Sequence, residues 1–116
     1  MNNQAFEVST TTGEKILFFS DPRGLLLNYI TGDQQGTTDS FSIGLKVSSL
    51  KRMLKSLQYG QKYIIDDRSL SAWEENRSLR LRFKSDGIEK QCELSPDETT
   101  KLVQFLSQYA AQKSVR

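Results

Sequence analysis

The chain has no histidine, one cysteine and two prolines, and it has no long apolar run. Without histidine it lacks the commonest general base near neutral pH and the commonest metal ligand in proteins. The single Cys92 has no partner for an internal disulfide, which is typical of a reducing compartment. No apolar run approaches the roughly 20 residues of a membrane span, and the N-terminal residues lack the basic and apolar regions of a signal peptide. We therefore expect a cytoplasmic protein with no membrane partner.

The reactive side chains that remain do not form a catalytic pattern. Cys92 falls inside a strand-like run without an evident base, which predicts a small buried hydrophobe. Asp66-Asp67 and Glu74-Glu75 are adjacent carboxylates, and neighbours in a strand point to opposite faces, so neither doublet predicts an acid/base pair. The scattered glycines show no phosphate-loop spacing. We predict that the protein is not an enzyme, with no catalytic residue, no cofactor and no metal site.

Length and composition predict one domain that spans residues 1–116. The chain is long enough to bury a core without metal or disulfide staples. Its 36% hydrophobic and 26% charged residues are ordinary for a folded domain. The net charge of +2 permits an anionic partner without requiring one, so the placement of the charges matters more than their sum.

The pattern of apolar residues predicts four short strands followed by an amphipathic helix, and then the same order again. The first half spans about residues 5–60 and the second about 61–112. Strands are expected over 6–10, 15–20, 25–31, 41–47, 62–66, 70–75, 78–85 and 88–94. Each half is marginal in size alone, which indicates that the two halves share one core.

Helix signals follow the last strand of each half. Ser48 or Ser49 is expected to cap the first helix, whose apolar stripe ends before Gly60. The second helix begins at 95–98, where a serine cap, a proline and a capping-box glutamate follow one another, and it is expected to fray after Ala111.

The clearest echo between the halves sets residues 21–29 beside 75–83, a shift of 54 positions. Both segments contain an acidic residue, a turn, an arginine and then alternating apolar residues. This doubled ββββα order resembles the PUR-repeat and Whirly proteins, with the PC4-like single-stranded DNA-binding domains as relatives. The resemblance covers nearly the whole chain as topology and transfers no residue motif. It implies an α+β fold of two antiparallel four-stranded sheets joined by two helices, with single-stranded DNA or RNA bound across strand surfaces.

A basic stripe is predicted in the second half. Arg80, Arg82 and Lys84 alternate with apolar residues, so a strand places all three cations on one face, about 7 Å apart. Such a row can follow a phosphate backbone, or it can simply solvate the exposed face of the strand. Arg23 and Arg77 occupy corresponding hairpin tips, where they are further candidates for phosphate contact.

Trp73 is the second component of the predicted single-strand site, because an aromatic ring stacks on any base. Its direction depends on the hairpin at 76–77. A two-residue loop places Trp73 opposite Arg80, on the basic face, whereas a three-residue loop with a bulge places it opposite Leu81, in the core. Phe19, the counterpart of Trp73 in the first half, inherits the same two alternatives.

Leu26 and Ile30 stand where the second half has its cations, so the matching face of the first half is apolar. An apolar sheet face on a small domain indicates burial against another protomer, such as a homodimer partner. The leading hypothesis is noncatalytic binding to single-stranded DNA or RNA, with regulation as a candidate role in the cell. The alternative is a homo-oligomeric assembly or adaptor protein that binds a protein partner.

Overall fold

A computed structural model of the chain describes residues 6–21, 24–32, 38–65 and 68–114. The first half contains β1 (Phe6–Ser9), β2 (Lys15–Asp21), β3 (Gly24–Gly32), β4 (Thr38–Lys46) and α1 (Val47–Gln58). The second half contains β5 (Tyr63–Ile64), β6 (Leu70–Glu75), β7 (Ser78–Ser85), β8 (Ile88–Leu94) and α2 (Pro96–Ser114). The predicted α+β fold with two ββββα units is therefore confirmed.

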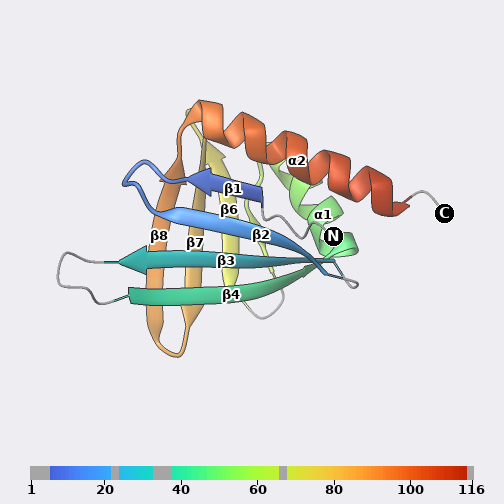
Figure 1. The fold of residues 1–116 in the computed structure, drawn as a ribbon. Coiled ribbons are helices and arrows are strands. Elements are labelled where there is room, and N and C mark those ends of the chain that lie inside the picture. The colour runs from blue at the N-terminus through green and yellow to red at the C-terminus, as the bar shows by residue number, and fades with distance from the viewer. Residues whose placement is uncertain (1–5, 22–23, 33–37, 66–67, 115–116) are drawn as a thin grey trace.

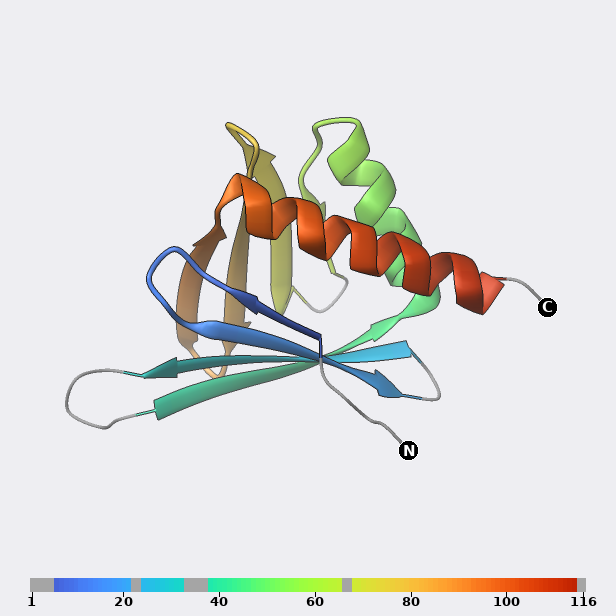
Figure 2. The same ribbon diagram turned by 45° about the horizontal axis from the view of Figure 1, so that its top comes forward.

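The strands form two antiparallel four-stranded sheets, each in simple sequence order. Sheet A contains β1 to β4, and sheet B contains β5 to β8. The strands of one sheet run across those of the other, and the two helices lie side by side along one end of both (Figure 1). Helix α2 contacts β1, β7 and β8, while α1 contacts β4, β5 and β6, so each helix joins the two sheets. Both helices lie on the same side of sheet A (Figure 2).

The two halves share the register of their central hairpin. In sheet A, Phe19 pairs with Leu26, and in sheet B, Trp73 pairs with Arg80. Both pairs are related by the same 54-position shift that the sequence echo indicates. The alignment of the two halves is thus reproduced by backbone hydrogen bonding and not only by residue type.

The hairpin between β6 and β7 has the two-residue loop, so Trp73 lies on the basic face and the bulged alternative is wrong. Glu75 pairs with Ser78, and both loop residues have positive φ, 54° at Asn76 and 69° at Arg77. Positive φ at both positions is the conformation of a type I′ turn, whose twist matches that of the flanking strands. Asparagine adopts such a φ readily, whereas arginine does so at a cost.

The core lies between the inner faces of the sheets and the helices. Tyr29 of β3 stacks on Phe83 of β7 with ring centroids 4.5 Å apart, which joins the two sheets at their centre. Phe105 of α2 stacks on Phe6 at 4.1 Å and so holds the second helix against β1. The predicted helical stripes are buried or half-buried; they comprise Leu50, Met53, Leu54 and Leu57 of α1 and Leu102, Phe105, Leu106 and Tyr109 of α2.

The two helices begin differently. The prediction that Ser48 or Ser49 caps α1 is wrong, because β4 runs directly into the helix and Lys46 is the N-cap without a side-chain hydrogen bond. Ser95 does cap α2, since its Oγ accepts a 3.3 Å hydrogen bond from the amide of Glu98. Helix α2 continues to Ser114 and passes the expected fraying point.

Glu98 does not complete the predicted capping box. Its carboxylate accepts a 2.9 Å hydrogen bond from the amide of Ser9 and lies 2.7 Å from Lys101 Nζ. The hydrogen bond with Lys101 and that with the Ser9 amide lower the pKa of Glu98. The start of α2 is thereby fixed to the first strand of the other half.

Gly24, at the start of β3, is required by close packing of backbone. A Cβ atom built there would lie 2.0 Å from the carbonyl oxygen of Leu45 in β4. The carbonyl of Gly24 also accepts a hydrogen bond from the buried hydroxyl of Tyr109 in α2. The glycine thus lets β3, β4 and the second helix meet at one point.

Candidate nucleic-acid interface

The outer face of sheet B is the surface that points away from the core. Arg80, Arg82 and Lys84 all lie on it, as the alternation predicts, because Leu79, Leu81 and Phe83 between them are buried. Strands β6 and β8 add their own outward residues beside this row: Ser71, Trp73, Glu75, Glu89, Gln91 and Glu93.

Trp73 lies half-buried on this face between two cationic side chains. Lys62, just before β5, places Nζ 4.7 Å from the ring centroid, and Arg82 of β7 places its guanidinium carbon 5.6 Å from it. Both distances are within the range of cation–π attraction, which is about 0.5–1 kcal/mol at exposed sites. The ring therefore contacts one cation from the segment before β5 and one from β7, and both groups can bind phosphate.

The arginines of the stripe already contact carboxylates. Arg80 Nε lies 3.3 Å from Glu75, and its Nη2 lies 3.8 Å from Glu93. Arg82 Nε lies 3.4 Å from Glu89. The arginines of the predicted basic row therefore lie beside glutamates, so the outer face of sheet B carries charges of both signs.

These ion pairs leave hydrogen-bonding capacity unused. The Nε atoms of Arg80 and Arg82 are buried, yet neither has a hydrogen bond of acceptable geometry among the described residues, despite the nearby carboxylate oxygens. The carboxylates therefore attract the guanidinium groups by charge, while their oxygens are not aligned with the Nε–H bonds. Since both guanidinium side chains are about a third exposed, such pairs are worth only about 0–1 kcal/mol, and an anionic ligand can compete for them.

The two lysines on this face are less constrained. Among the described residues, no ion pair is formed by Lys84, although it stands opposite Glu89 in the register, or by Lys62. Counting the described charges, the face carries four cations and three carboxylates: Lys62, Arg80, Arg82 and Lys84 against Glu75, Glu89 and Glu93. A weakly positive field with exposed cations at both ends of the Trp73–Arg82 pair follows.

A hollow of about 240 Å³ lies beside Arg80 at the β8 edge of sheet B, where the amide of Thr11 donates a 2.8 Å hydrogen bond to the carbonyl of Glu93. Gln91 and Glu93 of β8 line it together with Thr11 and Thr12 of the turn after β1. Their amide, carboxylate and hydroxyl groups can donate and accept hydrogen bonds, as recognition of a base edge requires. Residues from both halves thus meet beside Arg80 in this hollow.

Cys92 also reaches this hollow, but it has no reactive character. It is buried in β8, and burial together with the nearby Glu14 raises the pKa of its thiol to about 12. The thiol therefore stays protonated, which agrees with the predicted role of a small buried hydrophobe.

Two of the predicted site residues are not part of the central cluster. Arg77 is exposed at the tip of the β6–β7 hairpin, beyond the paired strands, and Lys84 lies at the opposite end of β7. Arg23 lies outside the described residues. The central cluster is therefore formed by Trp73, Arg82 and Lys62, with Arg80 beside it.

The sequence reasoning missed Lys62 and the carboxylates. The signal for the carboxylates was present, because Glu89, Gln91 and Glu93 alternate with Cys92 and Leu94 in the last strand. Antiparallel pairing of that strand with β7 places the glutamates on the same face as the arginines. Lys62 carried no such signal, since β5 has only two paired residues.

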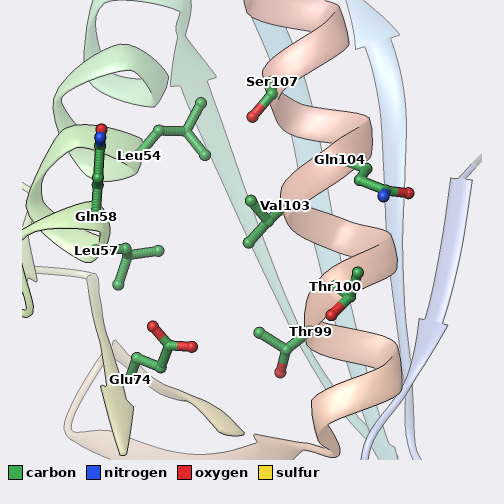
Figure 3. A pocket seen from close by; sticks show the side chains of 9 residues that line it. All are labelled: Leu54, Leu57, Gln58, Glu74, Thr99, Thr100, Val103, Gln104 and Ser107. Atoms are coloured by element: carbon green, nitrogen blue, oxygen red, sulfur yellow. The ribbon is translucent and has the colours of Figure 1, made fainter. Parts of the chain in front are cut away.

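A second concave feature lies between α1 and α2 (Figure 3). Its volume is about 430 Å³, and its walls include Leu54 and Leu57 of α1 and Val103 of α2. Glu74 is the single charged residue in its described lining, at one end of the cleft (Figure 3). One carboxylate among apolar and neutral side chains provides no acid/base pair.

Among the described residues, no three acidic, cysteine or histidine side chains lie close enough together to hold a metal ion. None of the described helices is long and apolar enough to cross a membrane. Comparison with protein families, curated proteins and solved structures finds no match to the chain.

Proposed function

We propose that this protein binds single-stranded DNA or RNA, without catalysis, across the outer face of sheet B. The observation that carries the proposal is the position of Trp73, on an exposed sheet face between Lys62 and Arg82. A base stacked on the ring contributes about 1–3 kcal/mol, which exceeds the roughly 0.5–1 kcal/mol of a cation–π contact that it displaces. The displaced cation then lies next to the phosphate of the same nucleotide.

Phosphate contacts are assigned to Arg80, Arg82 and Lys84, which follow one another along β7. Alternate residues of a strand are about 7 Å apart, so the three cations form a row along an extended backbone. Each phosphate neutralised on a single strand contributes about −0.7 to the slope of log affinity against log salt. Three contacts give a slope of about −2, and the competing carboxylates make the affinity modest.

The chain contains one tryptophan, so its fluorescence reports directly on the proposed stacking site. Titration with single-stranded oligothymidylate and oligouridylate is expected to quench Trp73, more weakly as salt is raised. Comparison of the two oligomers shows whether DNA or RNA is preferred. Absence of both quenching and association at low salt would overturn the proposed function.

A pair of lysine variants separates site-specific binding from a general effect of charge. Lys84→Gln is expected to reduce the salt slope by about 0.7, because one phosphate contact is lost. Lys90→Gln removes the same charge from the neighbouring strand, at an exposed position that pairs with buried Phe83 and so has the opposite parity. It should bind as the wild type does, and equal losses in both variants would contradict the assignment.

A further inference from the structure

The outer face of sheet A differs from that of sheet B although the two hairpins share one register. Trp73 and Arg80 of sheet B correspond to Phe19 and Leu26 of sheet A, and Lys84 corresponds to Ile30. Leu17 lies between these side chains, opposite Asn28. We call the outward apolar side chains of β2 and β3 the ridge; they are Leu17, Phe19, Leu26 and Ile30.

The ridge is not covered by the rest of the described chain. Leu26 and Ile30 are 36% and 39% exposed, and Leu17 and Phe19 are half-buried. Both helices and sheet B lie on the other side of sheet A (Figure 2). The ridge is therefore a contiguous apolar surface on an otherwise polar sheet face, which is typical of an interaction site.

Small residues run along one side of the ridge. Ser40, Ser42 and Gly44 of β4 pair with Ile30, Asn28 and Leu26, respectively. A Cβ atom built at Gly44 would have no atom within 4 Å, so the space above it is open. The ridge stands above this strand and leaves room for the apolar side chains of another molecule.

Charged residues of the described face lie at its margins and have both signs. Glu7 and Lys15 form a 2.9 Å ion pair near one margin, and Lys46 lies at the end of β4. An apolar centre with a polar rim is the usual anatomy of a protein interface. Because the rim carries charges of both signs, its electrostatic field does not favour a highly charged partner. In a two-fold contact, the positive residues of one copy can lie against the negative residues of the other.

The dimensions of the face also suit a dimer. Strands of seven and nine residues at about 3.3 Å per residue, with four strands about 4.8 Å apart, give roughly 500 Å² per copy. Two copies bury about 1,000 Å² or somewhat more, which is the lower limit for a specific interface. We infer that two copies of this chain associate through the outer faces of their A sheets, ridge against ridge.

Gly44→Arg tests the inference without disturbing the core, since the added side chain points into open space. By sedimentation velocity, the wild type is expected to change from 13.2 kDa monomer to a dimer of twice that mass as its concentration rises into the micromolar range. Gly44→Arg is expected to weaken the dimer at least 100-fold with an unchanged circular dichroism spectrum. Gln91→Arg, which adds the same side chain to the exposed face of sheet B, should dimerise normally.

A wild type that remains monomeric at millimolar concentration would overturn the inference and leave the face to a different protein. A dimer that tolerates Gly44→Arg would also overturn it, because the contact would then lie elsewhere. The binding of oligonucleotide to sheet B is measured separately through Trp73, so either inference can fail alone.

Discussion

Replacing Glu89 by glutamine is expected to tighten the binding of single-stranded nucleic acid, although it removes an ion pair. Its carboxylate lies 3.4 Å from Arg82 Nε and stands opposite Lys84 in the strand register. A phosphate bound to Arg82 would meet this negative charge at about 4–7 Å. In water the repulsion amounts to roughly 0.6–1 kcal/mol, which corresponds to about a three- to fivefold gain in affinity when it is removed.

The effect on stability has the opposite sign. The Glu89 side chain is 45% exposed, and an exposed ion pair contributes about 0–1 kcal/mol to folding. Glu89→Gln is therefore expected to have a slightly lower or unchanged free energy of unfolding together with a higher affinity. A role for Arg82 in stability alone predicts no gain in binding.

Glu74→Gln is the matched control, because it removes the same charge from sheet B but from the face that lines the interhelical cleft. Both variants are titrated with oligothymidylate at several salt concentrations, and Trp73 emission is measured. The advantage of Glu89→Gln over Glu74→Gln should be largest at low salt, because the Debye length shortens from about 30 Å at 0.01 M to about 10 Å at 0.1 M and the repulsion between Glu89 and a phosphate weakens accordingly. Equal or weaker binding by Glu89→Gln would refute the reasoning.

Three further predictions concern stability and reactivity. Gly24→Ala should lower the free energy of unfolding by about 3 kcal/mol or more, since its Cβ would overlap a β4 carbonyl, whereas Gly44→Ala should change it by less than about 0.5 kcal/mol in urea denaturation. Glu98→Gln should be about 1 kcal/mol less stable than the wild type at neutral pH. Because Lys101 and a backbone amide lower the pKa of Glu98, its contribution is present above the ordinary glutamate pKa and is lost as pH falls through the lowered pKa of the folded state, so the gap should close in acid; a constant gap would contradict this. Alkylation of Cys92 should be slow in the folded protein at mildly alkaline pH and fast in denaturant, because burial raises its pKa to about 12.

The hairpins of the second half could be predicted closely from the sequence. The expected ranges 70–75, 78–85 and 88–94 coincide with β6, β7 and β8, and the alternation is clearest in β7, where Leu79, Leu81 and Phe83 are buried between more exposed cations. The first strand of that half was predicted over 62–66, whereas the described part of β5 is Tyr63–Ile64, which pairs with Ala72 and Ser71 of β6. Its length depends on a neighbouring strand and not on its own pattern.

The candidate site was predicted only in part for the same reason. The direction of Arg80 and Arg82 follows from alternation within one strand. Their neutralisation by Glu75, Glu89 and Glu93 follows from which strands are adjacent and how far each side chain reaches. The start of α1 was mispredicted because the strand continues to Lys46 and leaves no serine outside the helix to cap it.

The stack of Tyr29 on Phe83 bears on how the two halves are joined. These residues are separated by 54 positions, so they are the same site in the two halves, and their rings meet at 4.5 Å. In a symmetric assembly a residue touches its own copy only on the two-fold axis. The contact between these equivalent residues is the arrangement that a two-fold axis between the rings produces in a homodimer. Joining the two halves in one chain makes their association intramolecular, so its cost does not depend on concentration and the outer face of each half can differ.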